Sequence, residues 1–123
     1  MKILIVEPFL SGSHKAWAES YAKHSKHEVE IISLPGRFWK WRMHGGAVTL
    51  AKRYHKLNFN PHLILATDML NLPVFQSLVK PECPVAIYFH ENQFTYPWSP
   101  NDEDVELQRD KHYGFINYSS ALS

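Results

Sequence analysis

The sequence has a single cysteine and no long apolar run, and both shortages narrow what the protein can be. With Cys83 alone, the 123-residue chain cannot form an internal disulfide and has no cysteine spacing typical of zinc sites. No stretch approaches the roughly 20 apolar residues that a membrane helix needs. Glu7 and Pro8 interrupt the apolar start, so the pattern of a signal peptide is missing as well. We therefore expect a cytoplasmic protein without a membrane span.

Glycine is scarce where a dinucleotide-binding enzyme would need it. Only Gly12 stands in the turn after the first apolar run, which falls short of the three-glycine fingerprint. Ser33 and Leu34 occupy the place, about 20 residues further on, where an NAD-binding carboxylate would lie. The pattern therefore argues against a dinucleotide enzyme. Gly12 would let the backbone approach a ligand at a helix start, although a tight turn explains this glycine about as well.

The charges of the chain are present in nearly equal numbers but are unevenly distributed. Net charge is +1, yet residues 1–60 contain 10 Lys and Arg against 4 Asp and Glu, whereas residues 61–123 contain 3 against 8. Such an asymmetry suggests one surface that faces a polyanion, unless folding interleaves the two halves. At 45% apolar residues, the chain can bury the core of one domain.

Apolar runs alternate with helical patterns along the chain. The runs predict four buried strands at Lys2–Val6, Val29–Leu34, Pro61–Thr67 and Val85–Phe89. Four helices are expected around Ala16–Ala22, from about Gly46 to Leu57, over Val74–Val79 and over Asp104–Ala121, the last with Val105, Gln108, His112, Phe115 and Ile116 on one side. This alternation predicts an α/β fold with a doubly wound parallel sheet.

The most informative stretch follows the fourth predicted strand. It reads Tyr88-Phe89-His90-Glu91-Asn92-Gln93-Phe94-Thr95-Tyr96-Pro97 and gathers a histidine, a carboxylate and two amides among aromatic residues. Ligands of parallel sheets bind in the crevice beyond the carboxyl ends of the strands. We therefore predict that His90 and Glu91 lie at the edge of a site, in preference to a satisfied histidine beside an ordinary polar loop.

Asp68 ends the third predicted strand at the same edge of the sheet. It could bind a ligand hydroxyl there, but we favour a role for Asp68 or Asn71 in capping the next helix. His90, Glu91 and His112 do not have the spacing of a zinc site, so neither a metal nor another cofactor is expected.

A second informative segment, residues 37–44, alternates cations with aromatic side chains. Its candidate binding residues are Arg37, Trp39, Lys40, Trp41 and Arg42. Cations contact phosphates, and exposed aromatic faces stack on bases. Contact with a nucleic acid or a phosphate is one interpretation. The other, equally favoured, is an amphipathic connection whose aromatic residues cover the sheet while the charges are solvated.

Four separated motifs together resemble the amino-terminal domain of the tRNA-queuosine α-mannosyltransferases, which are similar to the retaining glycosyltransferases of family 4. The motifs are Ile5–Phe9 with Gly12–Lys15, Leu34–Arg42, Thr67–Leu72 and Tyr88–Pro97. The resemblance runs from Met1 to Ser123. It implies the acceptor-side half of a GT-B type enzyme, with residues 1–123 as a partial Rossmann-like domain and the carboxy-terminal donor domain absent from this chain.

The resemblance also implies a reaction, in which mannose passes from GDP-mannose to queuosine in the anticodon of tRNA(Asp) by a retaining mechanism. A nucleotide sugar and queuosine-containing tRNA are then the expected partners, and the segment alone is expected to be inactive. The alternatives are a non-catalytic RNA- or phosphate-binding module, or a family 4-like transferase with a different acceptor.

The resemblance assigns roles to only a few individual residues. Gly12, with Ser13 and His14, matches the turn that approaches the donor's diphosphate, and His90 matches a histidine beside the transferred sugar. We place Glu91 with His90 in the catalytic group. Substrate contacts are expected from Asp68, Asn92 and Gln93 and from the tRNA-facing residues Arg37, Trp39, Lys40, Trp41 and Arg42.

Overall fold

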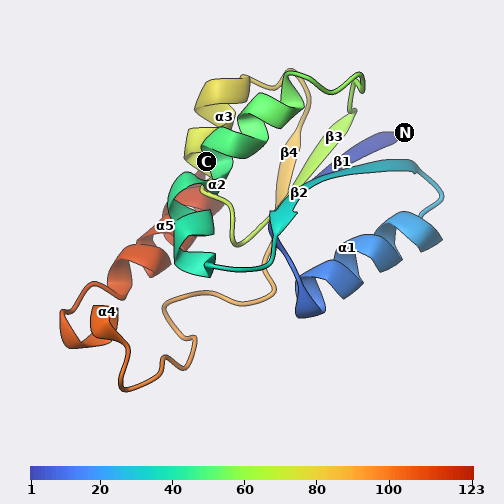
Figure 1. Cartoon of the computed structure of the whole chain (residues 1–123). Coiled ribbons are helices and arrows are strands. Elements are labelled where there is room, and N and C mark those ends of the chain that lie inside the picture. Colours follow the sequence, from blue (N-terminus) through green and yellow to red (C-terminus); the bar gives the residue numbers. More distant parts are fainter.

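Four parallel strands form the centre of the fold in the computed structural model, which describes all residues from 1 to 123 (Figure 1). The strands are β1 (Lys2–Leu10), β2 (Glu28–Pro35), β3 (Leu63–Thr67) and β4 (Val85–Tyr88), and their order in the sheet is β2-β1-β3-β4. The helices are α1 (Gly12–His24), α2 (Trp39–Tyr54), α3 (Leu72–Val79), α4 (Glu103–Glu106) and α5 (Lys111–Leu122). The predicted Rossmann-like, doubly wound parallel sheet is confirmed.

The direction of each crossover decides which face of the sheet its helix covers. From β1 the chain moves to β2 on one side, and from β2 it returns past β1 to β3 on the other side. Right-handed crossovers in opposite directions place α1 on one face and α2 with α3 on the other, as Figure 1 shows. The strand order therefore reverses between β1 and β3, and the carboxyl ends at such a reversal are where open α/β sheets bind ligands.

The main core lies between the sheet and the pair α2–α3. Leu4 and Val6 of β1 and Ile64 and Ala66 of β3 point to this side because alternate residues of a strand share a face. Helices α2 and α3 cover them with Ala47, Leu50, Ala51, Leu72, Phe75 and Val79. Ile3 and Ile5 of β1 point to the other face of the sheet and are also completely buried, and burial on both faces explains why the strands read as continuous apolar runs.

Helix α2 begins at Trp39, so the prediction of a start near Gly46 was wrong. Glycines 45 and 46 weaken a helix, but Gly46 lies where α2 packs closely on β1. A β-carbon at Gly46 would come within 3.3 Å of the Pro8 side chain, which is tighter than most such contacts. Close packing on β1 thus favours glycine at this position of the helix. Most of the cation–aromatic segment consequently forms the first turns of α2 instead of a loop.

The predicted final helix, Asp104–Ala121, is instead two helices, α4 and α5. The helical conformation is interrupted between them, where Gln108 adopts the left-handed conformation at φ 57°. The break changes the helical phase, so of the expected inward residues only Ile116 is buried, whereas Phe115 is exposed. The buried side of α5 carries Tyr113, Gly114, Ile116, Asn117 and Ser120.

The remaining differences concern the ends of elements. β1 continues beyond Val6 to Leu10, and its pairing with β2 shifts between Glu7 and Leu10. Helix α3 begins at Leu72 with Pro73 in its first turn, and its cap is Asn71, whose Oδ1 accepts from Val74 N at 3.5 Å. No helix of this structure combines the length and apolar character needed to cross a bilayer.

We predict that Phe75→Ala lowers the free energy of unfolding by about 3–5 kcal/mol, because Phe75 is completely buried in the main core. Chemical denaturation followed by circular dichroism measures this loss. Leu78→Ala on the same helix is the matched control, since Leu78 is exposed and its removal should change stability by no more than about 0.5 kcal/mol. Equal effects of the two substitutions would contradict the position of the core.

Candidate functional site

A cavity of about 270 Å³ opens at the carboxyl ends of β1, β3 and β4. Its walls come from the turn into α1, the first residue of α2 and the loop after β4. The predicted site residues in its lining are Gly12, Ser13, His14, Trp39, Glu91 and Gln93; the others are Phe9, Ser11, Met69 and Tyr96. The structure thus brings together residues of all four sequence motifs, at the edge of the sheet where the strand order reverses.

The beginning of α1 forms one wall of the cavity. Gly12 has φ +51°, a left-handed conformation that side chains other than glycine rarely adopt, so the turn requires this glycine. Ser11 precedes the helix but makes no side-chain capping bond. The first amides of a helix lack partners within the helix and carry its positive end, so this wall offers hydrogen-bond donors to a ligand.

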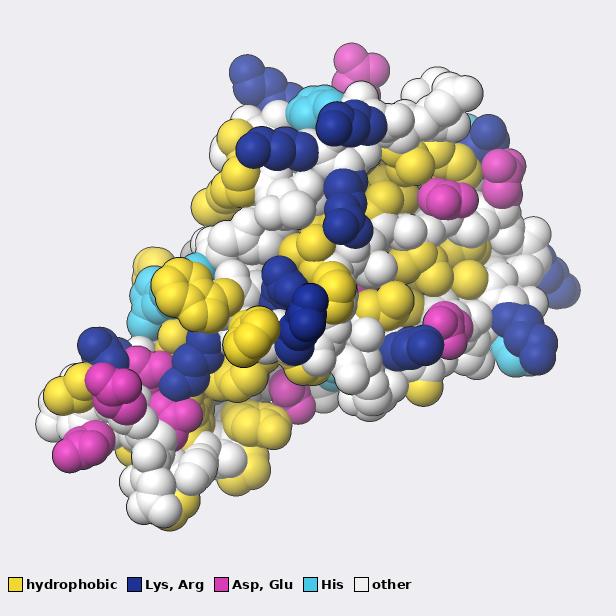
Figure 2. Space-filling view, in the orientation of Figure 1, with side chains coloured by type: hydrophobic (Ala, Val, Ile, Leu, Met, Phe, Trp, Pro, Cys, Tyr) yellow, Lys and Arg dark blue, Asp and Glu magenta, His cyan; other side chains and the backbone are white.

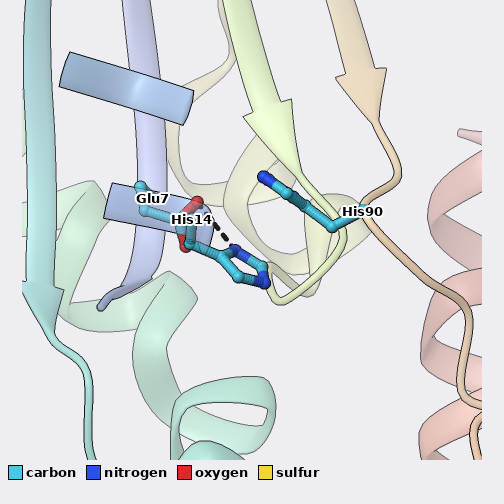
Figure 3. Close-up of side chains that lie close together, drawn as sticks. All are labelled: Glu7, His14 and His90. Carbon is cyan, nitrogen blue, oxygen red and sulfur yellow. Dashed lines mark hydrogen bonds and ion pairs between the residues drawn. The ribbon is translucent and has the colours of Figure 1, made fainter. Parts of the chain in front are cut away.

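His14 lies in the same wall and is held by a buried carboxylate, Glu7 of β1 (Figure 3). His14 Nδ1–H donates to Glu7 Oε2 at 3.1 Å, and the other oxygen, Oε1, accepts from Phe9 N at 2.8 Å. Burial alone would lower the pKa of His14. The hydrogen bond and charge of Glu7, with the charges of Asp68 and Glu91, outweigh it, so the pKa lies above its ordinary value.

A second histidine–carboxylate pair lies directly behind the first. Asp68, which is completely buried after β3, accepts from both His90 N and His90 Nδ1 through Oδ1, each at 3.1 Å. The ring of His90 stacks on that of His14, with centroids 3.9 Å apart and planes inclined by 25°. His90 approaches from the chain after β4 (Figure 3) and does not line the cavity. The Asp68 side chain therefore binds the loop after β4 through His90 and does not cap α3.

Four buried polar atoms at this edge of the sheet have no hydrogen-bond partner. They are Thr67 Oγ1, Asp68 Oδ2, His90 Nε2 and Gln93 Oε1. Unpaired buried polar groups are costly and are rare in a closed core. Their concentration at the carboxyl ends of β3 and β4, beside the cavity that Gln93 lines, is typical of a ligand site in a domain that pairs its other buried side-chain polar atoms.

Other residues of the lining accept hydrogen bonds. Glu91 contributes an exposed carboxylate, and Gln93 contributes its unpaired amide oxygen. The cavity lining contains no Lys or Arg. It therefore combines hydrogen-bond donors, from the α1 start and His14, with acceptors on Glu91 and Gln93 and with aromatic surface from Trp39 and Tyr96. Such a cavity suits a ligand that carries both an anionic group and hydroxyl groups.

Two groups of side chains could in principle hold a metal ion, namely Glu7, His14 and His90, and His14, Asp68 and Glu91. The stacking of the two histidine rings works against the first group. Each ring directs its nitrogen lone pairs within its own plane, and the rings lie face to face. Neither ring can direct a lone pair at a shared ion without rotating, whereas both are already oriented for hydrogen bonds to carboxylates.

Asn117 of α5 connects the two segments that border the cavity. Its Nδ2 donates to the carbonyl oxygen of Asp68, and its Oδ1 accepts from Gln93 N, both at 2.8 Å. Asn117 and Glu7 were not predicted as site residues. A carboxylate inside an apolar strand was a usable signal for Glu7. Nothing in the sequence near Asn117 distinguishes it from an exposed helix residue.

Asn92, another predicted contact, shapes the loop instead of lining the cavity. Its Oδ1 accepts from Phe94 N and Thr95 N and so forms the turn that places Gln93 inward. Asn92 also borders a separate shallow groove, whose other residues are Phe89, Phe94, Asn117, Tyr118 and Ala121.

One residue of the cation–aromatic segment lines the cavity, and the others lie at or near the surface. Trp39 lines the cavity, whereas Trp41 and Phe38 are 74% and 70% exposed. Arg37 is exposed, and Arg42 Nε donates to the carbonyl oxygen of Pro35 at 3.3 Å. Figure 2 shows a band of Lys and Arg side chains down the middle of one face and a group of acidic side chains over α4.

Lys40 connects the basic and acidic halves of the chain. Its Nζ donates to Asp102 Oδ1 at 2.7 Å and also pairs with Asp104. The ammonium group lowers the pKa of both carboxyl groups. Folding thus interleaves the two charge blocks at this point, and Lys40 is already neutralised, unlike Arg37.

Comparison with known proteins identifies the family. Residues 2–123 match the family model described as tRNA-queuosine alpha-mannosyltransferase N-terminal. The chain belongs to this family. A relative from Drosophila melanogaster, named tRNA-queuosine alpha-mannosyltransferase, is 36% identical over 128 residues, which cover 98% of this chain. The chain spans 31% of the length of that relative. No solved structure gave a significant match. The resemblance inferred from the four motifs is therefore confirmed.

We predict that Lys40→Met releases α4, so that amide hydrogen exchange in residues 102–106 becomes several-fold faster while exchange in β1 is unchanged. Acidification should have the same effect. Because the pKa of Asp102 and of Asp104 is lowered, the stabilisation is complete above their ordinary value of 3.8 and is lost as pH falls below it. The control is Lys52→Met, an exposed position on the same helix. Unchanged exchange in residues 102–106 would show that the ion pairs do not hold α4.

Proposed function

We propose that this chain forms the acceptor-side domain of an enzyme that transfers mannose from GDP-mannose to queuosine in the anticodon of tRNA(Asp), with retention of configuration. Membership of the family supports the proposal, as does the name of the Drosophila relative. The single structural observation that carries it is the cavity at the reversal of strand order, whose lining supplies both hydrogen-bond donors and acceptors. A glycosyl phosphate has the same two-part chemistry, an anionic group beside a ring of hydroxyl groups.

The orientation of the ligand follows from the positions of the donors and the acceptors in the lining. The phosphate oxygens would lie at the start of α1, where free amides and His14 supply donors. The sugar hydroxyls would lie toward Glu91 and Gln93, where oxygens accept hydrogen bonds. Positive charge that develops on the sugar during transfer would then lie near the Glu91 carboxylate, which stabilises it electrostatically.

His90 enters this scheme as a positioning residue. We predicted that it contacts the sugar, and its ring lies one layer behind the cavity wall, stacked on His14. Asp68 fixes its orientation through two hydrogen bonds. We propose that His90 keeps the His14 ring in place and that Glu91 is the catalytic group that touches the sugar. Gly12, Ser13 and His14 are the proposed contacts to the donor's diphosphate.

The exposed aromatic and basic residues beside the cavity support tRNA as the partner. Trp41 and Phe38 expose large apolar faces next to Arg37, and bases stack on such faces while arginine contacts phosphates. This observation also favours the second candidate function, a non-catalytic RNA-binding module. The two candidates differ only in whether a sugar is transferred.

A chimeric enzyme tests the transfer reaction. In it, residues 2–123 replace the matching amino-terminal region of the Drosophila relative, and queuosine-containing tRNA with GDP-mannose is supplied as substrate. We expect mass spectrometry of the digested nucleosides to show queuosine with one added hexose. Glu91→Gln should reduce the initial rate by about a hundredfold, because a carboxylate near developing charge contributes a few kcal/mol.

The chimera with Glu82→Gln is the matched control. Glu82 is exposed near the other end of the sheet, before β4, so it should leave the rate unchanged. A folded chimera that binds tRNA yet adds no hexose would favour the RNA-binding module. Undiminished transfer by the Glu91→Gln chimera would remove the proposed role of that residue.

We predict that Arg37→Gln and Trp41→Ala both weaken binding of the 123-residue chain to queuosine-containing tRNA in gel-shift titrations. Arg37→Gln should also reduce the salt slope of log affinity by about 0.7–0.9, the value for one lost phosphate contact, whereas Trp41→Ala should leave that slope unchanged. Lys26→Gln, an exposed change between α1 and β2, is the control for net charge. Equal slopes for all three variants would place the tRNA elsewhere.

A further inference from the structure

We infer that Glu7 is a positioning residue that keeps His14 doubly protonated and aims its Nε2–H at the phosphate oxygens of the ligand. The inference rests on the proposed function only for the identity of that ligand. Glu7 touches neither the cavity nor the substrate. Its effect on the reaction would pass entirely through His14, which lines the cavity.

Glu7 is placed where an unpaired carboxylate would be very unfavourable. It is completely buried in β1, between two neighbouring strands. Transfer of an isolated carboxylate out of water is costly unless a cation or several donors accompany it. The only cationic partner that the structure gives Glu7 is His14, and its other donor is the neutral amide of Phe9. The burial of Glu7 therefore favours the protonated form of His14.

The orientation of the pair leaves one direction for the remaining ring N–H. Phe9 N fixes Oε1 of Glu7, so Oε2 is the oxygen that faces α1. His14 uses Nδ1 for this bond, which leaves Nε2 as its free nitrogen. His14 is only 6% exposed, and that small exposure is toward the cavity that it lines. A protonated ring held in this way is a donor at both nitrogens and an acceptor at neither.

The charged groups around His14 all favour its protonated form. Glu7 faces it from β1, Asp68 from the end of β3, and Glu91 from the loop after β4. The ring of His90 stacks on His14 and is itself bonded to Asp68. Three carboxylates thus favour the positive form of His14, with Glu7 making the only direct bond among them. An anionic ligand would meet this charge together with the free amides of α1.

The first measurement is the protonation state of His14 in the unmodified 123-residue chain. Long-range ¹H–¹⁵N spectra distinguish a ring protonated at both nitrogens from a neutral ring. We expect both nitrogens of His14 to carry protons at pH 6.5, and we expect the midpoint of its titration to lie above that value. A ring protonated at one nitrogen at pH 6.5 would overturn the inference without any substitution.

The second measurement compares Glu7→Gln with Glu19→Gln. Glutamine keeps the volume of Glu7 and removes its charge, so the His14 midpoint should move to lower pH. Glu19 lies on α1 with an exposed side chain paired to Lys15, so its removal changes net charge equally and should leave His14 unaffected. An unchanged midpoint in Glu7→Gln, with the fold retained by circular dichroism, would overturn the inference.

Binding of inorganic pyrophosphate, followed by the same spectra, connects the pair to the ligand. We expect affinity to fall as pH rises through the His14 midpoint and to be about tenfold weaker in Glu7→Gln at pH 6.5, the usual effect of losing one charge-assisted hydrogen bond. An affinity for pyrophosphate that does not change as His14 titrates would show that the Glu7–His14 pair is only structural and would overturn the inference.

The outcomes for the two proposals remain separable. A chimera that transfers no mannose, beside a His14 that titrates and binds pyrophosphate as expected, removes the proposed reaction and leaves the role of Glu7 intact. Mannose transfer that is insensitive to Glu7→Gln removes the role of Glu7 and leaves the proposed reaction intact.

Discussion

The site depends on two carboxylates that lie out of water, Glu7 in β1 and Asp68 after β3. Such groups need hydrogen-bond donors nearby, because the free energy lost on dehydration is otherwise not recovered. Each receives a histidine from a segment outside its own strand, His14 from the start of α1 and His90 from the chain after β4. Satisfying the two carboxylates therefore also fixes two segments that contribute to the cavity lining. The stacked histidine rings join the pairs into one layer.

The sheet topology explains why this layer forms at all. Parallel strands end at a common edge, and the order β2-β1-β3-β4 makes β1 and β3 neighbours although about 50 residues separate them in sequence. Glu7 and Asp68 thus belong to adjacent strand ends. The apolar faces of the same strands are covered by helices on both sides, so the polar residues can emerge only at the edge. The core and the site are consequently two results of one arrangement.

Much of this could be predicted from sequence because the information is local. Buried parallel strands leave continuous apolar runs, and a cluster such as His90 to Gln93 after one of them indicates a site. Other features depend on tertiary contacts. The start of α2 was misplaced because Gly46, inside the helix, lies at a close crossing with Pro8. The buried face of α5 was misassigned because the helix is interrupted at Gln108. Glu7 stood within a recognised motif, but its role became evident only with His14 beside it.

The bridge made by Asn117 also determines when the site can exist. Asn117 joins the carbonyl of Asp68 to the amide of Gln93, and it lies in α5. On the ribosome, strands β1 to β4 emerge before Asn117 does, so these strands can pair while the loop after β4 still lacks its hydrogen bond to α5. The cavity therefore takes its final form only after the four strands of this sheet have been synthesised, and ligand recognition comes later than formation of the sheet.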